Sequence, residues 1–284
     1  MSSLSPEGRE ALPSLPLGPS TISMDVMSLN EEEVDVLETE SVDTATDVGG
    51  DGRRKRAEQE KEGEQCSSLT WFGTDKQLVR GIYDGWARTY EQESLDELGF
   101  SSPMECAKAT ALWAQGRGVE RLLDVGCGTG YVLKLLKECF GLNFSFSAGC
   151  DLSTEMLSVS RERKMYDDLR QLDISEYPWP YPTASFDTVC CNGVLIYVSD
   201  AECLEEFDRV TRPGGMIHLM LRHDGLSGYR EKIGEMTSSN GREREGGARW
   251  ELVEKSEDLD NFPKATQDNL KGVMYNIWSF RKRG

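Results

Sequence analysis

The first 70 residues of this 284-residue chain contain no aromatic side chain, although the whole sequence has 6 Trp, 9 Tyr and 9 Phe. Residues 1–65 carry 16 acidic and 6 basic side chains. A segment with this composition cannot bury enough apolar surface to offset its conformational entropy. We therefore expect residues 1–68 to form a disordered acidic tail, and residues 69–284 to form one folded domain.

Long apolar runs, metal-binding patterns and a positive net charge are also missing. No run of 18 apolar residues occurs, so we expect no membrane span. The 8 cysteines form no Cys-x-x-Cys pair and only 2 histidines are present, so we expect no metal site. The net charge of −18 repels phosphate backbones, which makes a nucleic acid an unlikely partner.

The same features bear on the compartment. The first 20 residues lack the apolar core of a signal peptide, so secretion is not expected. Several cysteines lie in apolar runs, which is typical of free thiols in a reducing compartment. We expect the cytosol, or the nucleus if the basic run 53–56 is an import signal. The other reading of that run is a solvated block of charge.

Helix and strand patterns alternate after the tail. The expected helices are 77–94, 102–115, 131–140, 153–163, 200–212 and 229–236. The expected strands are 121–125, 144–150, 169–172, 185–192, 216–221, 250–254 and 273–280. The pattern Ser-Pro-Met-Glu at 102–105 predicts a capping box at the start of its helix, and 241–247 is expected to be a charged loop.

This order predicts an α/β fold. Alternating units form a parallel sheet with helices on both faces. The two last strands have no convincing helix between them, so they are expected to form an antiparallel hairpin at one edge. The result is a Rossmann-like, seven-stranded, mostly parallel sheet, which binds ligands beyond the carboxyl ends of its strands.

A glycine-rich turn follows the first strand, within Leu122–Gly130 (LLDVGCGTG). Glycines at alternate positions allow a tight turn and let backbone N–H groups approach a ligand. Asp124 precedes the turn, and Asp151 ends the next strand 21 residues after Gly130. A carboxylate at that place can accept both ribose hydroxyls of a nucleotide. The spacing G-x-G-x-G differs from the G-x-G-x-x-G of NAD enzymes, which argues against a nicotinamide oxidoreductase.

The turn, the later phrase GCDLSTEML and the phrase YDGWARTY at 83–90 together resemble a known family. Over about residues 75–224 the chain resembles the class I S-adenosylmethionine-dependent methyltransferases. The phrase at 83–90 is most similar to the methyltransferase-like proteins of the Williams–Beuren region group. The resemblance implies the Rossmann-like class I methyltransferase fold, S-adenosyl-L-methionine as the cofactor and methyl transfer as the activity.

The resemblance also assigns cofactor-binding positions along the strand ends. It places the methionine end at the glycine turn, the ribose at the second strand, the adenine at the second and third strands, and the sulfonium at the end of the fourth. A helix near residue 85 would act as a lid, although its aromatic side chains could equally be packing. The residues implied are Tyr83, Trp86, Asp124, Gly126, Cys127, Gly128, Gly130, Asp151, Leu152, Asp173, Ile174, Asn192 and Gly193.

The acceptor and any catalytic base are less defined. Methyl transfer from a sulfonium needs positioning and exclusion of water, and it needs a base only where the acceptor must lose a proton. His223 and Tyr197 are weak candidates. His223 is better explained as a partly exposed loop residue, and Tyr197 is equally well explained as covering the next helix. We expect a small-molecule acceptor. The alternative is a catalytically silent, cofactor-binding regulatory protein, with a protein partner reached through the acidic tail.

Overall fold

The computed structural model describes residues 75–238 and 248–284. The expected tail 1–68, the basic run 53–56 and the expected loop 241–247 lie outside the described residues.

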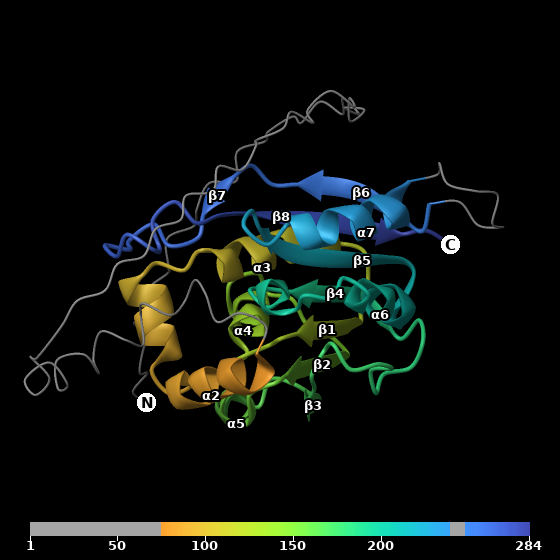
Figure 1. Ribbon diagram of the computed structural model, residues 1–284. Coiled ribbons are helices and arrows are strands. Elements are labelled where there is room, and N and C mark those ends of the chain that lie inside the picture. Colours follow the sequence, from red (N-terminus) through yellow and green to blue (C-terminus); the bar gives the residue numbers. More distant parts are fainter. Residues whose placement is uncertain (1–74, 239–247) are drawn as a thin grey trace, which may run out of the picture. The chain divides into compact units, whose positions relative to one another are not determined.

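A single mixed sheet forms the centre of the described part (Figure 1). Its strands are β1 (Arg121–Val125), β2 (Phe146–Asp151), β3 (Asp168–Gln171), β4 (Phe186–Cys191), β5 (Thr211–Arg222), β6 (Trp250–Lys255), β7 (Leu259–Asp260) and β8 (Met274–Lys282). The order across the sheet is β3-β2-β1-β4-β5-β8-β6, with β7 paired to β8. The first five strands pair in parallel, and β8 pairs antiparallel with both β5 and β6.

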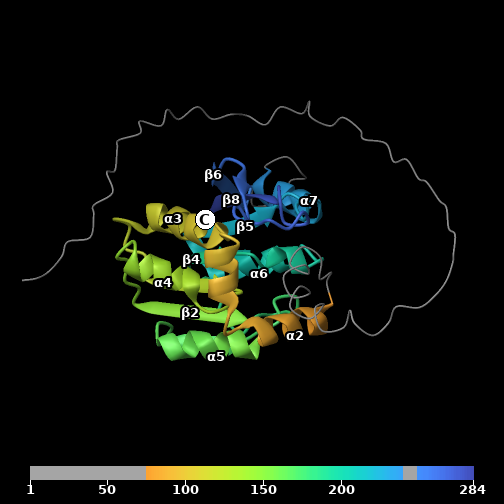
Figure 2. The same cartoon turned by 90° about the vertical axis from the view of Figure 1, so that its left-hand side faces the viewer.

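Helices cover both faces of this sheet. They are α2 (Lys76–Trp86), the π-helix η1 (Glu91–Glu97), α3 (Ser102–Ala114), α4 (Tyr131–Glu138), α5 (Thr154–Arg163), the 3₁₀ turn η2 (Leu195–Tyr197), α6 (Cys203–Val210) and α7 (Ser227–Thr237). In Figure 2, α3, α4 and α5 lie on one face, and α6 and α7 lie on the other. One apolar cluster joins α3 and α4 to the sheet, and a second joins α6 and α7 to its opposite face.

The predicted α/β architecture is therefore confirmed, including the antiparallel edge. The strand β7 is an addition to the seven expected strands, and it is only two residues long. Strand β5 also begins earlier than expected, because Thr211 pairs with Phe186 before the bulge at the glycine turn.

Two local predictions are wrong. The helix expected over 77–94 ends at Trp86 and is followed by turns and then η1. The expected capping box at 102–105 does not form, because the helix α3 begins one residue earlier than the pattern suggests. Ser101 occupies the N-cap position without capping, and its hydroxyl instead contacts Asp260 O and Tyr275 Oη, each at 2.8 Å.

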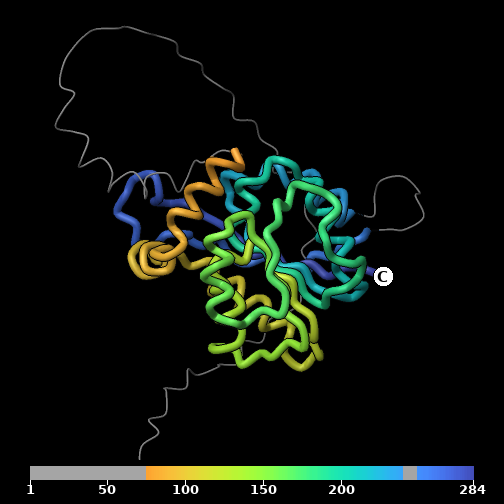
Figure 3. Tube along the Cα trace, turned by 90° about the horizontal axis from the view of Figure 1, so that it is seen from below, coloured from red at the N-terminus to blue at the C-terminus, as the bar shows by residue number. Residues whose placement is uncertain are grey.

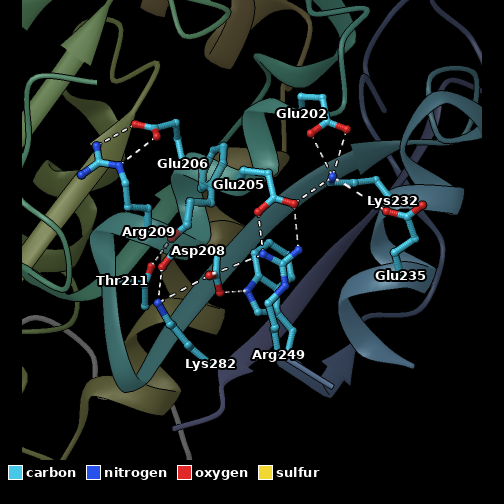
Figure 4. A network of polar contacts seen from close by, with 12 residues as sticks. Glu202, Glu205, Glu206, Asp208, Arg209, Thr211, Lys232, Glu235, Arg249 and Lys282 are labelled. Carbon is cyan, nitrogen blue, oxygen red and sulfur yellow. Dashed lines mark hydrogen bonds and ion pairs between the residues drawn. The ribbon is translucent and has the colours of Figure 1, made fainter. Parts of the chain in front are cut away.

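A network of ion pairs attaches the C-terminal strands and α7 to α6 (Figure 4). Arg249, just before β6, donates both terminal nitrogens to the carboxylate of Glu205 on α6. Lys232 on α7 lies 2.8 Å from the same carboxylate and 2.9 Å from that of Glu202. The pKa of Glu205 is lowered to about 2, and the hydrogen bonds from Arg249 are the largest cause. The network therefore supplements apolar burial where the antiparallel edge meets the helices.

Two segments far apart in the sequence meet beside the carboxyl end of the sheet. The golden turn of η1 and the blue segment before β8 lie next to each other in Figure 3. Lys264 N donates to Leu98 O at 3.1 Å, and Ser101 N donates to Asn261 O at 3.2 Å. The rings of Phe100 and Phe262 stack with centroids 5.4 Å apart. This junction adds an apolar wall at the edge where the parallel strands end.

Candidate functional site

A cavity of about 1170 Å³, its open mouth included, lies over the carboxyl ends of the parallel strands. Successive strands are added on one side of β1 as far as β3, and the next strand, β4, is added on the other side of β1. In open α/β sheets, ligands bind in the crevice at this switch point. The cavity is therefore the candidate active site, and its walls come from α2, η2, the strand ends and the segment before β8.

The glycine-rich turn after β1 forms the floor of the cavity. Gly126 and Gly128 line it with φ values of +69° and +51°, in the left-handed region that favours glycine. A β-carbon on Gly126 would also overlap the side chain of Val194. The turn is held by Cys127 N, which donates to Cys150 O at 2.9 Å, and by Gly128 N, which donates to Asp151 Oδ2 at 2.8 Å. The sequence at this turn is thus dictated by backbone geometry.

Asp151 ends β2 beside this floor. Its Oδ1 accepts from Ser153 N at 2.9 Å and its Oδ2 accepts from Gly128 N. Each carboxylate oxygen has a second acceptor site, so both can still accept a hydroxyl from a ligand in the cavity. Burial raises the pKa of Asp151 even though the two backbone N–H groups lower it.

The helix α2 covers the β2 and β3 side of the cavity through polar contacts. Lys76 Nζ lies 2.7 Å from Asp173 Oδ2. Ser153 caps α5 by accepting from Met156 N, and its hydroxyl donates to Asp84 Oδ1 on α2 at 2.6 Å. Leu152 and Ile174 line the same part of the cavity.

Aromatic side chains form the wall opposite the glycine turn. The hydroxyls of Tyr83 and Tyr197 lie 3.0 Å apart, and the Tyr83 ring lies 6.1 Å from that of Trp86 and 6.2 Å from that of Tyr90. The Trp86 side chain also belongs to an apolar cluster with Val79, and its Nε1 donates to Glu93 Oε2 at 2.7 Å. Burial is the main reason that the pKa of both Tyr83 and Tyr197 is raised, so both hydroxyls are protonated at neutral pH.

Residues 123–219 match the family model described as a methyltransferase domain. The match supports a class I S-adenosylmethionine-dependent methyltransferase family for this part of the chain, with S-adenosylmethionine as the cofactor.

Two curated relatives support this assignment. The chain is 30% identical over 146 residues to demethylmenaquinone methyltransferase of Chlorobaculum tepidum, which is 50% of this chain and 58% of that protein. It is 37% identical over 99 residues to malonyl-[acyl-carrier protein] O-methyltransferase of Serratia marcescens, which is 34% of this chain and 36% of that protein. The chain thus spans less than two thirds of the length of these relatives.

The fold is similar to that of the [4+2]-cyclase SpnF, with a TM-score of 0.53 and 18% identity over 74% of this chain and 97% of that one. Since that protein is named as a cyclase, the fold by itself does not fix the reaction. No helix in the two described ranges is long and apolar enough to cross a membrane.

The cavity has features that suit S-adenosylmethionine. The Oδ1 atom of Asn192, at the end of β4, is buried and makes no hydrogen bond within the described residues. The next residue, Gly193, has a φ of +75°, and a β-carbon there would lie 3.4 Å from the ring of Phe100. An unpaired acceptor and an open backbone in the same cavity as Asp151 fit a ligand that carries hydroxyls and positive charge.

The cavity brings together most of the residues that the sequence implied. These are Tyr83, Trp86, Gly126, Gly128, Asp151, Leu152, Asp173, Ile174, Asn192, Gly193 and Tyr197. Four others, namely Asp124, Cys127, Gly130 and His223, do not line it.

Each of these four is engaged elsewhere. Asp124 is 1% exposed and accepts from Tyr166 Oη at 2.6 Å, and burial raises its pKa to about 6. Cys127 is buried in the turn, where burial raises its pKa well above the usual value. Gly130 is the N-cap of α4. The His223 ring faces β8, with Nε2 2.9 Å from Asn276 Oδ1.

Sequence reasoning missed several residues that line the domain's cavity on the β5 side. They are Phe100, Met220, Arg222, Asn261 and Phe262. For Arg222 a signal was present, because it ends the strand next to β4, and the sequence had placed the sulfonium at the end of β4. For Phe100 and Phe262 no local pattern existed, since they meet only through the contact between η1 and the segment before β8.

Proposed function

We propose that this chain transfers the methyl group of S-adenosylmethionine to a small-molecule acceptor. The observation that carries the proposal is the division of the cavity. Its β1 to β3 side presents Asp151, Asp173 and the glycine turn, while its β4 to β5 side presents apolar and aromatic side chains together with Asn192 and Arg222. One side suits a polar cofactor, and the other offers room for a second molecule next to it.

The strand order suggests how the cofactor lies. Asp151 would accept the two ribose hydroxyls, with Leu152 and Ile174 against the adenine and Asp173 near its edge. The glycine turn would face the methionine end, and Asn192 and Gly193 would lie by the sulfonium. When bound, the cofactor supplies an activated methyl group on a positively charged sulfur.

The chain's own residues would act mainly by positioning and by excluding water. The Tyr83 and Tyr197 hydroxyls, protonated at neutral pH, can donate hydrogen bonds but do not serve as bases in that state. His223 lies outside the lining, so the proposal assigns it no role. An acceptor that is already nucleophilic fits this site, because no free base lines its β5 side among the described residues.

Several finer assignments belong to the same proposal. Residues 69–284 would form the methyltransferase domain, in the cytosol or nucleus, and residues 1–68 would be an acidic tail able to reach a protein partner. Similarity to the Williams–Beuren group rests on the phrase at 83–90, followed by LLDVGCGTG and GCDLSTEML. A small acceptor is supported by relatives named for a quinone and for an acyl-carrier protein, and by the negative net charge of the chain.

Two measurements test the proposed function. Titration calorimetry of the full chain should show binding of S-adenosylmethionine and S-adenosylhomocysteine, and none of NADH. Incubation with methyl-labelled cofactor and a fractionated cell extract should then transfer label to a compound in a small-molecule fraction. Cofactor binding without transfer to any fraction, protein fractions included, would favour the silent regulatory alternative, and absence of cofactor binding would refute both.

A further inference from the structure

Arg222 is a buried cation on the acceptor side of the cavity. It ends β5 and lines the cavity together with Met220, two residues earlier on the same face of the strand. Its side chain is 4% exposed. Arginine is rarely buried to this extent unless a partner offsets its charge, because the guanidinium stays ionised.

The position of Arg222 follows from the strand order. The strands β3, β2, β1 and β4 are consecutive neighbours in the sheet. At their carboxyl ends lie, in the same order, Asp173, Asp151, the glycine turn and Asn192. Arg222 ends the next neighbour, β5, one strand spacing of about 5 Å further on. A cofactor laid across β3 to β4 therefore leaves Arg222 facing whatever binds next to its reactive end.

The partner that Arg222 has in the protein leaves part of the guanidinium free. Nε donates to Asp224 Oδ1 at 3.0 Å and Nη2 donates to Asp224 Oδ2. Nη1 makes no hydrogen bond within the described residues. The edge formed by Nη1 and the second N–H of Nη2 is the one that binds a carboxylate in bidentate fashion. Asp224 is 52% exposed, so water screens its charge much more than that of Arg222.

Other cations in the lining are already used at the far side. Lys76 pairs with Asp173, and Arg80 lies 3.4 Å from the carboxylate of Asp84. The two acidic residues of the lining, Asp151 and Asp173, also belong to that side. Arg222 instead shares the cavity lining with apolar side chains that include Met220 and Phe262.

We infer that the methyl acceptor carries a carboxylate, which the free edge of Arg222 binds, and an apolar body that packs toward Phe100 and Phe262. This inference rests on the proposed function. Because water screens the exposed Asp224, the single positive charge of Arg222 remains available to offset one negative charge of a ligand. A phosphate, which carries about −1.5 to −2 at neutral pH, would be left with uncompensated charge in an apolar room.

The test uses the full chain saturated with S-adenosylhomocysteine, whose binding is first verified by calorimetry. Phenylacetate and hydrocinnamate are titrated against their primary amides and against benzylphosphonate, with binding followed by ligand-observed NMR. At least one carboxylate should bind about tenfold or more tightly than its amide, as expected for a charge-assisted pair. Equal affinity of acid and amide at both lengths, or tighter binding of the phosphonate, would overturn the inference.

Variants separate recognition from structural support. Arg222→Gln should abolish the preference for the acid, whereas Arg230→Gln, the same change at an exposed position of α7, should preserve it. Asp224→Asn should strengthen carboxylate binding, since it removes the competing carboxylate. If Asp224→Asn instead weakens binding as much as Arg222→Gln does, the pair is structural and the inference fails. If the unmodified chain does not bind S-adenosylhomocysteine, the proposed function is refuted before any carboxylate is titrated.

Discussion

The substitution Asp151→Asn is expected to weaken cofactor binding without unfolding the protein. The carboxylate accepts from Gly128 N at 2.8 Å and from Ser153 N at 2.9 Å. An asparagine can replace only one of these acceptors, because its NH₂ group would face the other backbone N–H. The ribose hydroxyls would also lose a charged acceptor, which costs about 1.5–3 kcal/mol. The dissociation constant should therefore rise about 10- to 150-fold.

Titration calorimetry of the variant at several pH values tests this expectation. Because burial raises the pKa of Asp151, the unmodified chain should lose cofactor affinity as the pH falls toward that raised pKa, whereas the variant should lose this dependence. Asp167→Asn is the matched control, since Asp167 Oδ2 accepts from Ser147 N at 2.7 Å near the start of β2, away from the cavity. An unchanged affinity in Asp151→Asn, or an equal loss in both variants, would refute the assignment of Asp151 to the ribose.

Three further substitutions address burial and charge. Asp124→Asn should raise the free energy of unfolding relative to the unmodified chain, and this gain should be larger above pH 6 than at pH 4 by on the order of 2–3 kcal/mol. The reason is that the raised pKa of about 6 makes the ionised form of Asp124 costly in the folded state. Urea titrations that give the same gain at both pH values would contradict this. Trp86→Phe removes the hydrogen bond to Glu93. It should weaken the binding of S-adenosylmethionine more than that of S-adenosylhomocysteine, by about 0.5–1 kcal/mol. Equal losses of binding free energy in calorimetry would argue against a lid role. Glu205→Gln should lower the free energy of unfolding at pH 7 by about 1 kcal/mol or less, since the ion pair with Arg249 is partly exposed. This loss of stability should vanish as the pH falls through about 2. A loss that persists at that pH would show that packing, and not charge, is responsible.

Local sequence patterns determined most of the sheet and the cofactor side of the cavity. Strands β1, β2 and β4 are short apolar runs bounded by turn residues, and such runs are readable because a buried strand needs apolar side chains on both faces. The glycine turn is readable for a related reason, since positive φ at Gly126 and Gly128 leaves glycine as the residue that fits. Asp151 follows from its fixed distance along the chain, because β2 is a direct parallel neighbour of β1.

Tertiary structure decided where chemically informative side chains point. Asp124 adjoins the glycine turn in sequence, yet its carboxylate is directed to Tyr166, because alternate residues of a strand face opposite sides of the sheet. The break after Trp86 and the failure of the capping box likewise depend on long-range partners such as Asp260 and Tyr275. Local propensity has no access to such contacts.

The acceptor side of the cavity depended on the tertiary structure most of all. Phe100 and Phe262 are separated by most of the domain's length in sequence and stack only because η1 meets the segment before β8. Arg222 ends the strand β5, which pairs with β4, and Asn192 follows β4 thirty residues earlier in the chain. The residues proposed to bind the cofactor lie in one continuous turn and at the ends of the strands beside it, so local sequence could indicate them. The residues proposed to bind the acceptor come from separate segments, which only the folded backbone brings together.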